Sequence, residues 1–108
     1  MKETVREAVA SPENQVFIST VSAWEISIKV ALKRLVFPIE RFDEVALLMG
    51  FDVLPIIPAH AVLSGTLPRH HADPFDRMLV AQAMVEKLLL VSVDAEIGQY
   101  DVKRFDDA

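Results

Sequence analysis

Hydrophobic and polar positions along this chain follow helical and strand periods in turn. Apolar residues at helical spacing predict helices over residues 1–10, 22–37, 40–49, 59–65 and 74–87. Runs of apolar and β-branched residues predict strands over residues 15–20, 51–57 and 88–93, followed by a short helical segment over 95–100 and an edge strand over 102–105. This order predicts an α/β fold class, a three-layer sandwich in which helices flank a mostly parallel central sheet.

Composition is consistent with one folded domain over residues 1–108, since 52% of residues are hydrophobic and 25% are charged. Cysteine is absent, which excludes disulfides and thiolate metal sites. No apolar run approaches the ~20 residues that a membrane span needs. We therefore expect a soluble, cytoplasmic protein with no membrane partner. The net charge of −5 argues against a module held on nucleic acid by phosphate attraction alone, but not against an enzyme that meets nucleic acid through divalent cations.

The start of the predicted helix over residues 74–87 carries two carboxylates. Asp73 suits the N-cap, Pro74 suits the first helical position, and Asp76 falls at the third. Glu25 lies in the predicted first turn of an earlier helix, and Asp94 directly follows the strand over residues 88–93. Ligands of open parallel sheets bind beyond the carboxyl ends of the strands, where Glu25 and Asp94 are expected to lie. If the start of the helix at Pro74 points the same way, Asp76 converges with them. Carboxylates without thiols suit Mg²⁺ or Mn²⁺, which can activate water and neutralise phosphate.

Each of these acids also has a purely structural explanation. Ser22 and Glu25 fit a capping box at the start of a helix. Asp76 is favoured by the positive end of the helix dipole, and Asp94 can cap the segment that follows it.

Several basic and aromatic residues leave similar alternatives open. Four cations either form a phosphate-facing rim or belong to solvated helix faces: Lys29, Lys33, Arg69 and Arg77. His70 and His71 either act on RNA or are exposed loop residues. Trp24 fits the apolar core better than a base-stacking role.

Three segments together resemble the PIN-domain toxins of the VapC type. They read T-V-S-A-W-E-I-S-I-K over residues 20–29, D-P-F-D-R-M-L-V-A-Q-A over 73–83 and L-V-S-V-D over 90–94. The resemblance covers nearly the whole chain, in the same order and with similar gaps. It implies a PIN-like fold and a Mg²⁺- or Mn²⁺-dependent endoribonuclease, the toxin of a toxin–antitoxin pair, with RNA as substrate and a VapB-type antitoxin as partner. It also implies Glu25, Asp76 and Asp94 as catalytic metal ligands, with Ser92 and Asp73 in supporting positions.

The chain departs from that family at its start. Such toxins open with an apolar strand that ends in an aspartate, ahead of the helix that residues 1–10 resemble, and neither has a counterpart here. A shortened chain, a misplaced start codon and a degenerate toxin all fit this departure. Fewer acids should weaken metal binding, and exposed strand edges should favour a homodimer or higher oligomer. The alternative function is a catalytically inactive PIN-like module that only binds an antitoxin or self-associates.

Overall fold

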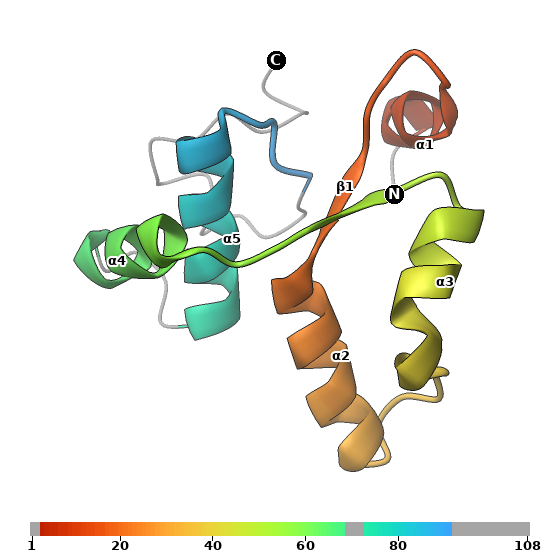
Figure 1. The fold of residues 1–108 in the computed structure, drawn as a ribbon, viewed down its shortest axis with the longest axis horizontal. Coiled ribbons are helices and arrows are strands. Elements are labelled where there is room, and N and C mark those ends of the chain that lie inside the picture. The colour runs from red at the N-terminus through yellow and green to blue at the C-terminus, as the bar shows by residue number, and fades with distance from the viewer. Residues whose placement is uncertain (1–2, 69–72, 92–108) are drawn as a thin grey trace. The chain divides into compact units, whose positions relative to one another are not determined.

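Helices and short strands alternate along the chain, as a computed structural model that describes residues 3–68 and 73–91 shows (Figure 1). The elements are α1 (Glu3–Ala10), β1 (Phe17–Ser19), α2 (Thr20–Ala31), the 3₁₀ turn η1 (Ile39–Arg41), α3 (Phe42–Leu48), β2 (Asp52–Leu54), α4 (Pro58–Thr66) and α5 (Pro74–Glu86). They belong to two compact units: the β1–β2 unit, Pro12–Pro55, and the α4–α5 unit, Met1–Ser11 with Ile56–Ala108. The expectation of one domain over residues 1–108 stays a prediction.

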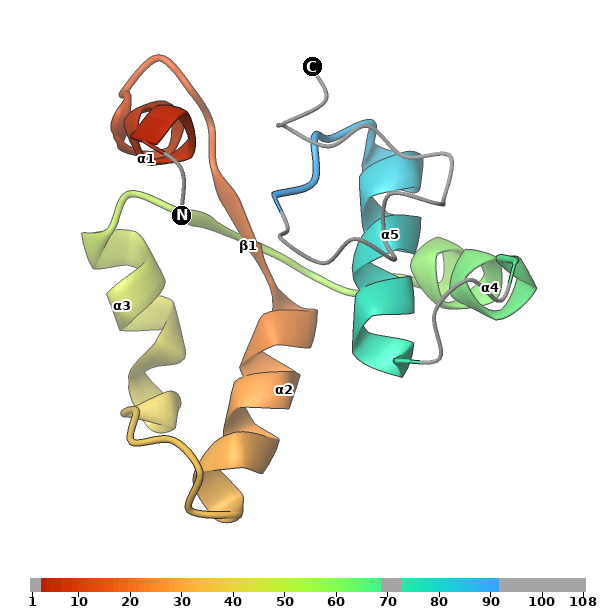
Figure 2. The same cartoon turned by 180° about the vertical axis from the view of Figure 1, so that it is seen from behind.

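The β1–β2 unit is built on a pair of parallel strands. Phe17 lies opposite Asp52, and Ser19 lies opposite Leu54. The connection between the strands passes through α2, η1 and α3, as parallel pairing requires a crossover. Seen from behind, β1 runs directly into α2 (Figure 2). A parallel sheet flanked by helices confirms the predicted fold class.

Both strands are shorter than predicted, and the third predicted strand is only partly described. Thr20 already belongs to α2, and β2 ends ahead of Pro55, which has no N–H to donate to a neighbouring strand. Over residues 88–91 the chain forms no strand, although Leu90 makes a single β-bridge. Residues 92 and 93 and the segments predicted over 95–100 and 102–105 lie outside the described residues.

The predicted capping box at Ser22 and Glu25 is wrong. Ser19 is the N-cap of α2: its extended backbone ends β1, and its Oγ accepts the N–H of Val21 at 2.9 Å. Glu25 therefore lies in the second turn of α2 rather than the first. The helix also ends at Ala31, well before Pro38, because Lys33 adopts a left-handed backbone with φ 59°. The N–H of Arg34 then bonds the Lys29 carbonyl at 2.9 Å, which closes the helix end.

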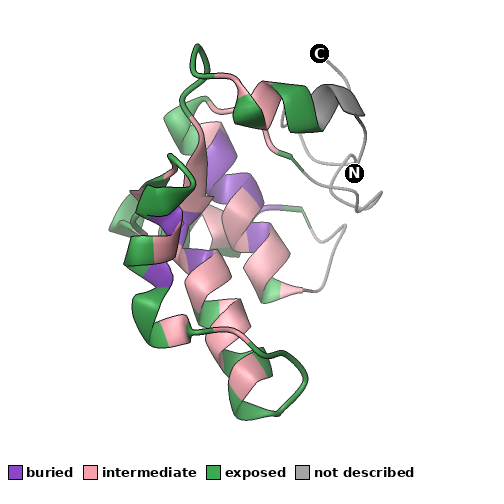
Figure 3. Ribbon diagram, turned by 90° about the vertical axis from the view of Figure 1, so that its right-hand side faces the viewer, coloured by how far each residue is buried: buried purple, intermediate pink, exposed green. Residues whose placement is uncertain are grey.

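The predicted core-facing stripe of α2 is largely exposed among the described residues. Trp24 is 51% exposed and Leu32 is 58% exposed, and Ile28 and Leu35 are also classed as exposed. The buried apolar side chains of this unit are Val21, Phe42 and Ala46. Figure 3 colours the described residues by burial, with buried positions in purple. In the helix predicted over residues 40–49, apolar spacing thus gives buried positions at Phe42 and Ala46, whereas Met49 is exposed. Helical spacing identified an apolar face on α2, but much of that face is exposed.

The α4–α5 unit has its core where these two helices pack on each other. Leu67, Val80 and Ala81 are buried there, with Leu63, Met84 and Leu90 packed around them. Asp73 caps α5 as predicted, since its Oδ1 accepts the N–H groups of Phe75 and Asp76 at 2.8 and 3.3 Å. Ala83 is also buried on this face of α5, whereas Val85 is exposed. No helix in the described ranges has the length and apolar character needed to cross a bilayer.

Candidate functional site

Two of the predicted acids lie together at the start of α5. Asp76 is the third residue of the helix, and its N–H is held by the Asp73 carboxylate. Both residues are half-buried. Asp73 therefore has the capping role that the sequence predicted, and it keeps the first turn of α5 closed around Asp76. This turn is the best-defined part of the candidate site.

Of the other predicted site residues, Glu25 is described, whereas Ser92 and Asp94 are not. Glu25 belongs to the β1–β2 unit, where its Oε2 lies 3.6 Å from Nζ of Lys29 one helical turn later. The Glu25 side chain is 32% exposed, so it can exchange this ion pair for another cation at small cost. Ser92 and Asp94 lie outside the described residues, as do Arg69, His70 and His71.

The number, donor type and helix position of the described acids show how far they suit a divalent cation. Within the described ranges, no three His, Asp or Glu side chains gather closely enough to hold a metal ion. The donor type is suitable, because Asp73 and Asp76 offer only carboxylate oxygens. The positive end of the α5 dipole opposes a cation, however, so Asp76 needs further carboxylates to bind one. The predicted convergence of Glu25, Asp76 and Asp94 stays a prediction.

Arg77, next to Asp76, is one of the few buried charged residues, with 8% of its surface exposed. Its Nη1 donates to the Pro68 carbonyl at 2.9 Å. Its Nη2 donates to the carbonyls of Ser64 and Leu67 at 2.7 and 3.0 Å. Both explanations offered for this residue, a phosphate-facing rim and a solvated face, are therefore wrong.

The burial of Arg77 has a signal in the sequence, namely its spacing from apolar residues of the same helix. Arg77 lies three and four residues before Val80 and Ala81, so it shares the buried face of α5 with them. A cation on such a face must find acceptors, and the last carbonyls of a preceding helix are a ready source.

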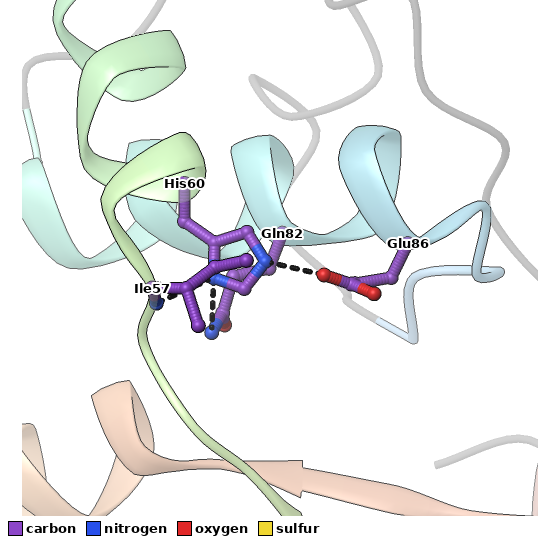
Figure 4. Close-up of polar contacts among 4 residues, drawn as sticks. All are labelled: Ile57, His60, Gln82 and Glu86. Atoms are coloured by element: carbon purple, nitrogen blue, oxygen red, sulfur yellow. Dashed lines mark hydrogen bonds and ion pairs between the residues drawn. The ribbon is translucent and has the colours of Figure 1, made fainter.

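His60, which is 0% exposed, links the first turn of α4 to the end of α5 (Figure 4). The Ile57 N–H donates to His60 Nδ1 at 3.2 Å, and Gln82 Nε2 lies 3.4 Å from the same nitrogen. Because Nδ1 accepts, the ring proton is on Nε2, which donates to Glu86 Oε2 at 2.7 Å. These contacts involve no nucleophile, and they are best explained as a structural tie between the helices.

Comparison with known proteins gives one match. The family model described as PIN domain matches residues 1–103, a range that spans both units and includes Glu25, Asp73, Asp76, Ser92 and Asp94. No curated protein and no solved structure matches the chain.

Proposed function

The chain belongs to the PIN domain family, and from this premise we propose that it is a metal-dependent endoribonuclease toxin of the VapC type. PIN domains are generally nucleases, so a hydrolytic nuclease module follows from membership. The RNA substrate, the toxin role and the Mg²⁺ or Mn²⁺ dependence are our proposals. They are supported by the S-x-W-E-I and D-P-F-D-R segments over residues 22–26 and 73–77. A toxin that acts on cellular RNA works in the cytoplasm, which we propose as its location.

The observation that carries this proposal is the first turn of α5. Asp76 is presented there by a capped helix start, with Arg77 anchored directly behind it. We propose Glu25, Asp76 and Asp94 as the metal ligands, with Ser92 and Asp73 supporting them. The divalent cation, when bound, supplies a nucleophilic water and neutralises charge on the scissile phosphate. The chain's own part is to hold the carboxylates in place and to keep the helix start rigid.

We further propose that the chain binds partners through exposed apolar surface. Several large apolar side chains of the β1–β2 unit are exposed, namely Trp24, Leu32, Val36, Leu47, Leu48 and Met49. Apolar surface of this kind favours association. We propose two partners for this surface: further copies of the chain, which would form a homodimer or higher oligomer, and a VapB-type antitoxin.

Cleavage of RNA by the purified chain tests the proposed activity. We expect Mn²⁺-dependent cleavage of structured RNA such as total tRNA, abolished by a chelator. Mutating a residue that only supports a metal ligand typically lowers activity by roughly 10- to 100-fold. Removing one of the proposed ligands should therefore lower the cleavage rate by at least this factor. Glu25→Gln, Asp76→Asn and Asp94→Asn are the test variants.

The matched control is Asp43→Asn. Asp43 is an exposed acid in the first turn of α3, so its variant removes the same charge as Asp76→Asn from the first turn of another helix. This variant should retain wild-type cleavage. Intact tRNA at every Mn²⁺ and protein concentration would refute the nuclease proposal. An inactive chain that still binds an antitoxin peptide would instead support the inactive-module function.

A further inference from the structure

Arg77 joins the start of α5 to the end of α4 through three carbonyl groups. Ser64 lies in the last turn of α4, and Leu67 and Pro68 follow it directly. The last carbonyls of a helix have no partner within the helix, and their partial negative charge attracts a cation. The guanidinium therefore satisfies acceptors that would otherwise be left unpaired in a part of the chain where Leu67 is buried.

The geometry of the guanidinium makes this contact a rotational constraint. Its N–H donors lie in one rigid plane, and the acceptors here engage both terminal nitrogens at once. Such an arrangement fixes the direction in which Arg77 leaves the helix. Successive residues of an α-helix are about 100° apart around its axis, so a fixed direction at Arg77 also fixes the direction at Asp76.

The contacts made by Asp73 and His60 hold α5 in other ways. Asp73 closes the first turn along the helix axis by bonding backbone N–H groups. The His60 contacts engage Gln82 and Glu86, which lie six and ten residues beyond Asp76 along α5. Arg77 ties the Asp76 end of α5 to the end of α4 through three hydrogen bonds.

We propose that Arg77 is a positioning residue for Asp76: its bonds to the carbonyls of Ser64, Leu67 and Pro68 set where the Asp76 carboxylate points. This inference rests on the proposed function, because it concerns the direction of a proposed metal ligand. It assigns a role to the arginine of the D-P-F-D-R segment that involves no contact with RNA.

Arg77→Lys is the decisive variant. Lysine keeps the charge and most of the stem, but its single nitrogen cannot reproduce a planar fork on three carbonyls. Arg77→Met removes the charge as well and serves as a second variant. Val80→Ala is the stability control, because Val80 is fully buried in the same helix pair but lies away from the first turn. Arg41→Lys is the chemical control, since Arg41 is exposed and pairs with Glu44.

Amide hydrogen exchange on the metal-free protein measures how firmly the first turn of α5 is held. In Arg77→Lys, exchange at the Phe75 and Asp76 amides should accelerate at least tenfold. The exchange rate of these two amides should change less than twofold in Arg41→Lys. It should also change less than twofold in Val80→Ala, when each protein is measured equally far below its own melting temperature. Equal acceleration in Arg77→Lys and Val80→Ala would mean that Arg77 acts only through overall stability, which overturns the proposal. So would unchanged exchange in Arg77→Lys.

Mn²⁺ titration followed by electron paramagnetic resonance separates the positioning role from the proposed function. If the wild type binds Mn²⁺, Arg77→Lys should weaken the affinity at least tenfold and lower kcat, while KM for RNA stays within about twofold. Unchanged Mn²⁺ affinity would overturn the proposal. If the wild type neither binds Mn²⁺ nor cleaves RNA, the proposed function fails, and the exchange data alone decide whether Arg77 fixes the start of α5.

Discussion

The tie made by His60 gives the sharpest stability prediction, because its two ring nitrogens do different things. Nδ1 accepts the Ile57 N–H at 3.2 Å, and Nε2 donates to the Glu86 carboxylate at 2.7 Å. The ring itself is fully buried. Two variants separate the nitrogens: asparagine keeps an acceptor near the Nδ1 position, and glutamine keeps a donor near the Nε2 position. Alanine removes both.

The expected magnitudes follow from the charge on each partner. A hydrogen bond to a charged group contributes about 1.5–3 kcal/mol and a neutral one about 0.5–1.5 kcal/mol. The Glu86 side chain is 35% exposed, so water replaces part of the lost bond and the lower end of its range applies. We therefore expect His60→Gln to cost about 1 kcal/mol and His60→Asn about 1.5–2 kcal/mol. His60→Ala, which also leaves a cavity, should cost about 3 kcal/mol.

Urea unfolding followed by circular dichroism measures these costs, with thermal unfolding as a second readout. At about 4–8 °C per kcal/mol, the cost of about 3 kcal/mol for His60→Ala should lower Tm by about 12–24 °C. Glu86→Gln is the matched control, since a neutral amide oxygen still accepts from Nε2 and should cost under about 1 kcal/mol. A glutamine variant less stable than the asparagine variant would refute the assignment of the ring proton to Nε2. An alanine variant within about 0.5 kcal/mol of wild type would refute the tie itself.

Three further outcomes follow from the same structure. Asp73→Ala should lower the free energy of unfolding by about 1 kcal/mol and Asp73→Ser by much less, measured in urea, because serine also caps helices; equal losses would count against the cap. Lys87→Gly should raise that free energy by up to about 1 kcal/mol in the same assay, because Lys87 ends α5 with φ 58°, and a loss would contradict this. Leu48→Glu should shift the mass measured by light scattering toward the monomer, whereas an unchanged oligomer would exclude this part of α3 from the interface.

The parts of the fold that depend on neighbouring residues could be predicted from the sequence. The start of α5 is the clearest case, because an N-cap aspartate, a proline at the first position and an apolar face all lie within one segment. Gly50, with φ 78°, similarly follows the end of α3, directly after the helix predicted over residues 40–49. In both cases the signal and the structure involve the same few residues.

The parts that depend on distant residues could not be predicted. Both Ser19 and Ser22 can cap a helix, and the choice depends on where β1 stops pairing with β2, more than thirty residues later. The acceptors of Arg77 are backbone carbonyls, which carry no sequence signature. For the candidate site, the sequence identified Asp73 and Asp76 through their helix position. The convergence of Glu25, Asp76 and Asp94 depends on how strand ends are arranged, and local patterns do not encode that arrangement.

The division of the chain into units has a consequence for the order of folding during synthesis. The β1–β2 unit is continuous in sequence, so it can fold as soon as it leaves the ribosome. The α4–α5 unit combines Met1–Ser11 with Ile56–Ala108, so α1 is made first but completes its unit last. At about 5–20 residues per second, that wait lasts several seconds. Under the proposed function, Glu25 and Asp76 then become available at different times, and the proposed metal ligands are complete only after the segment that carries Asp94 has been made.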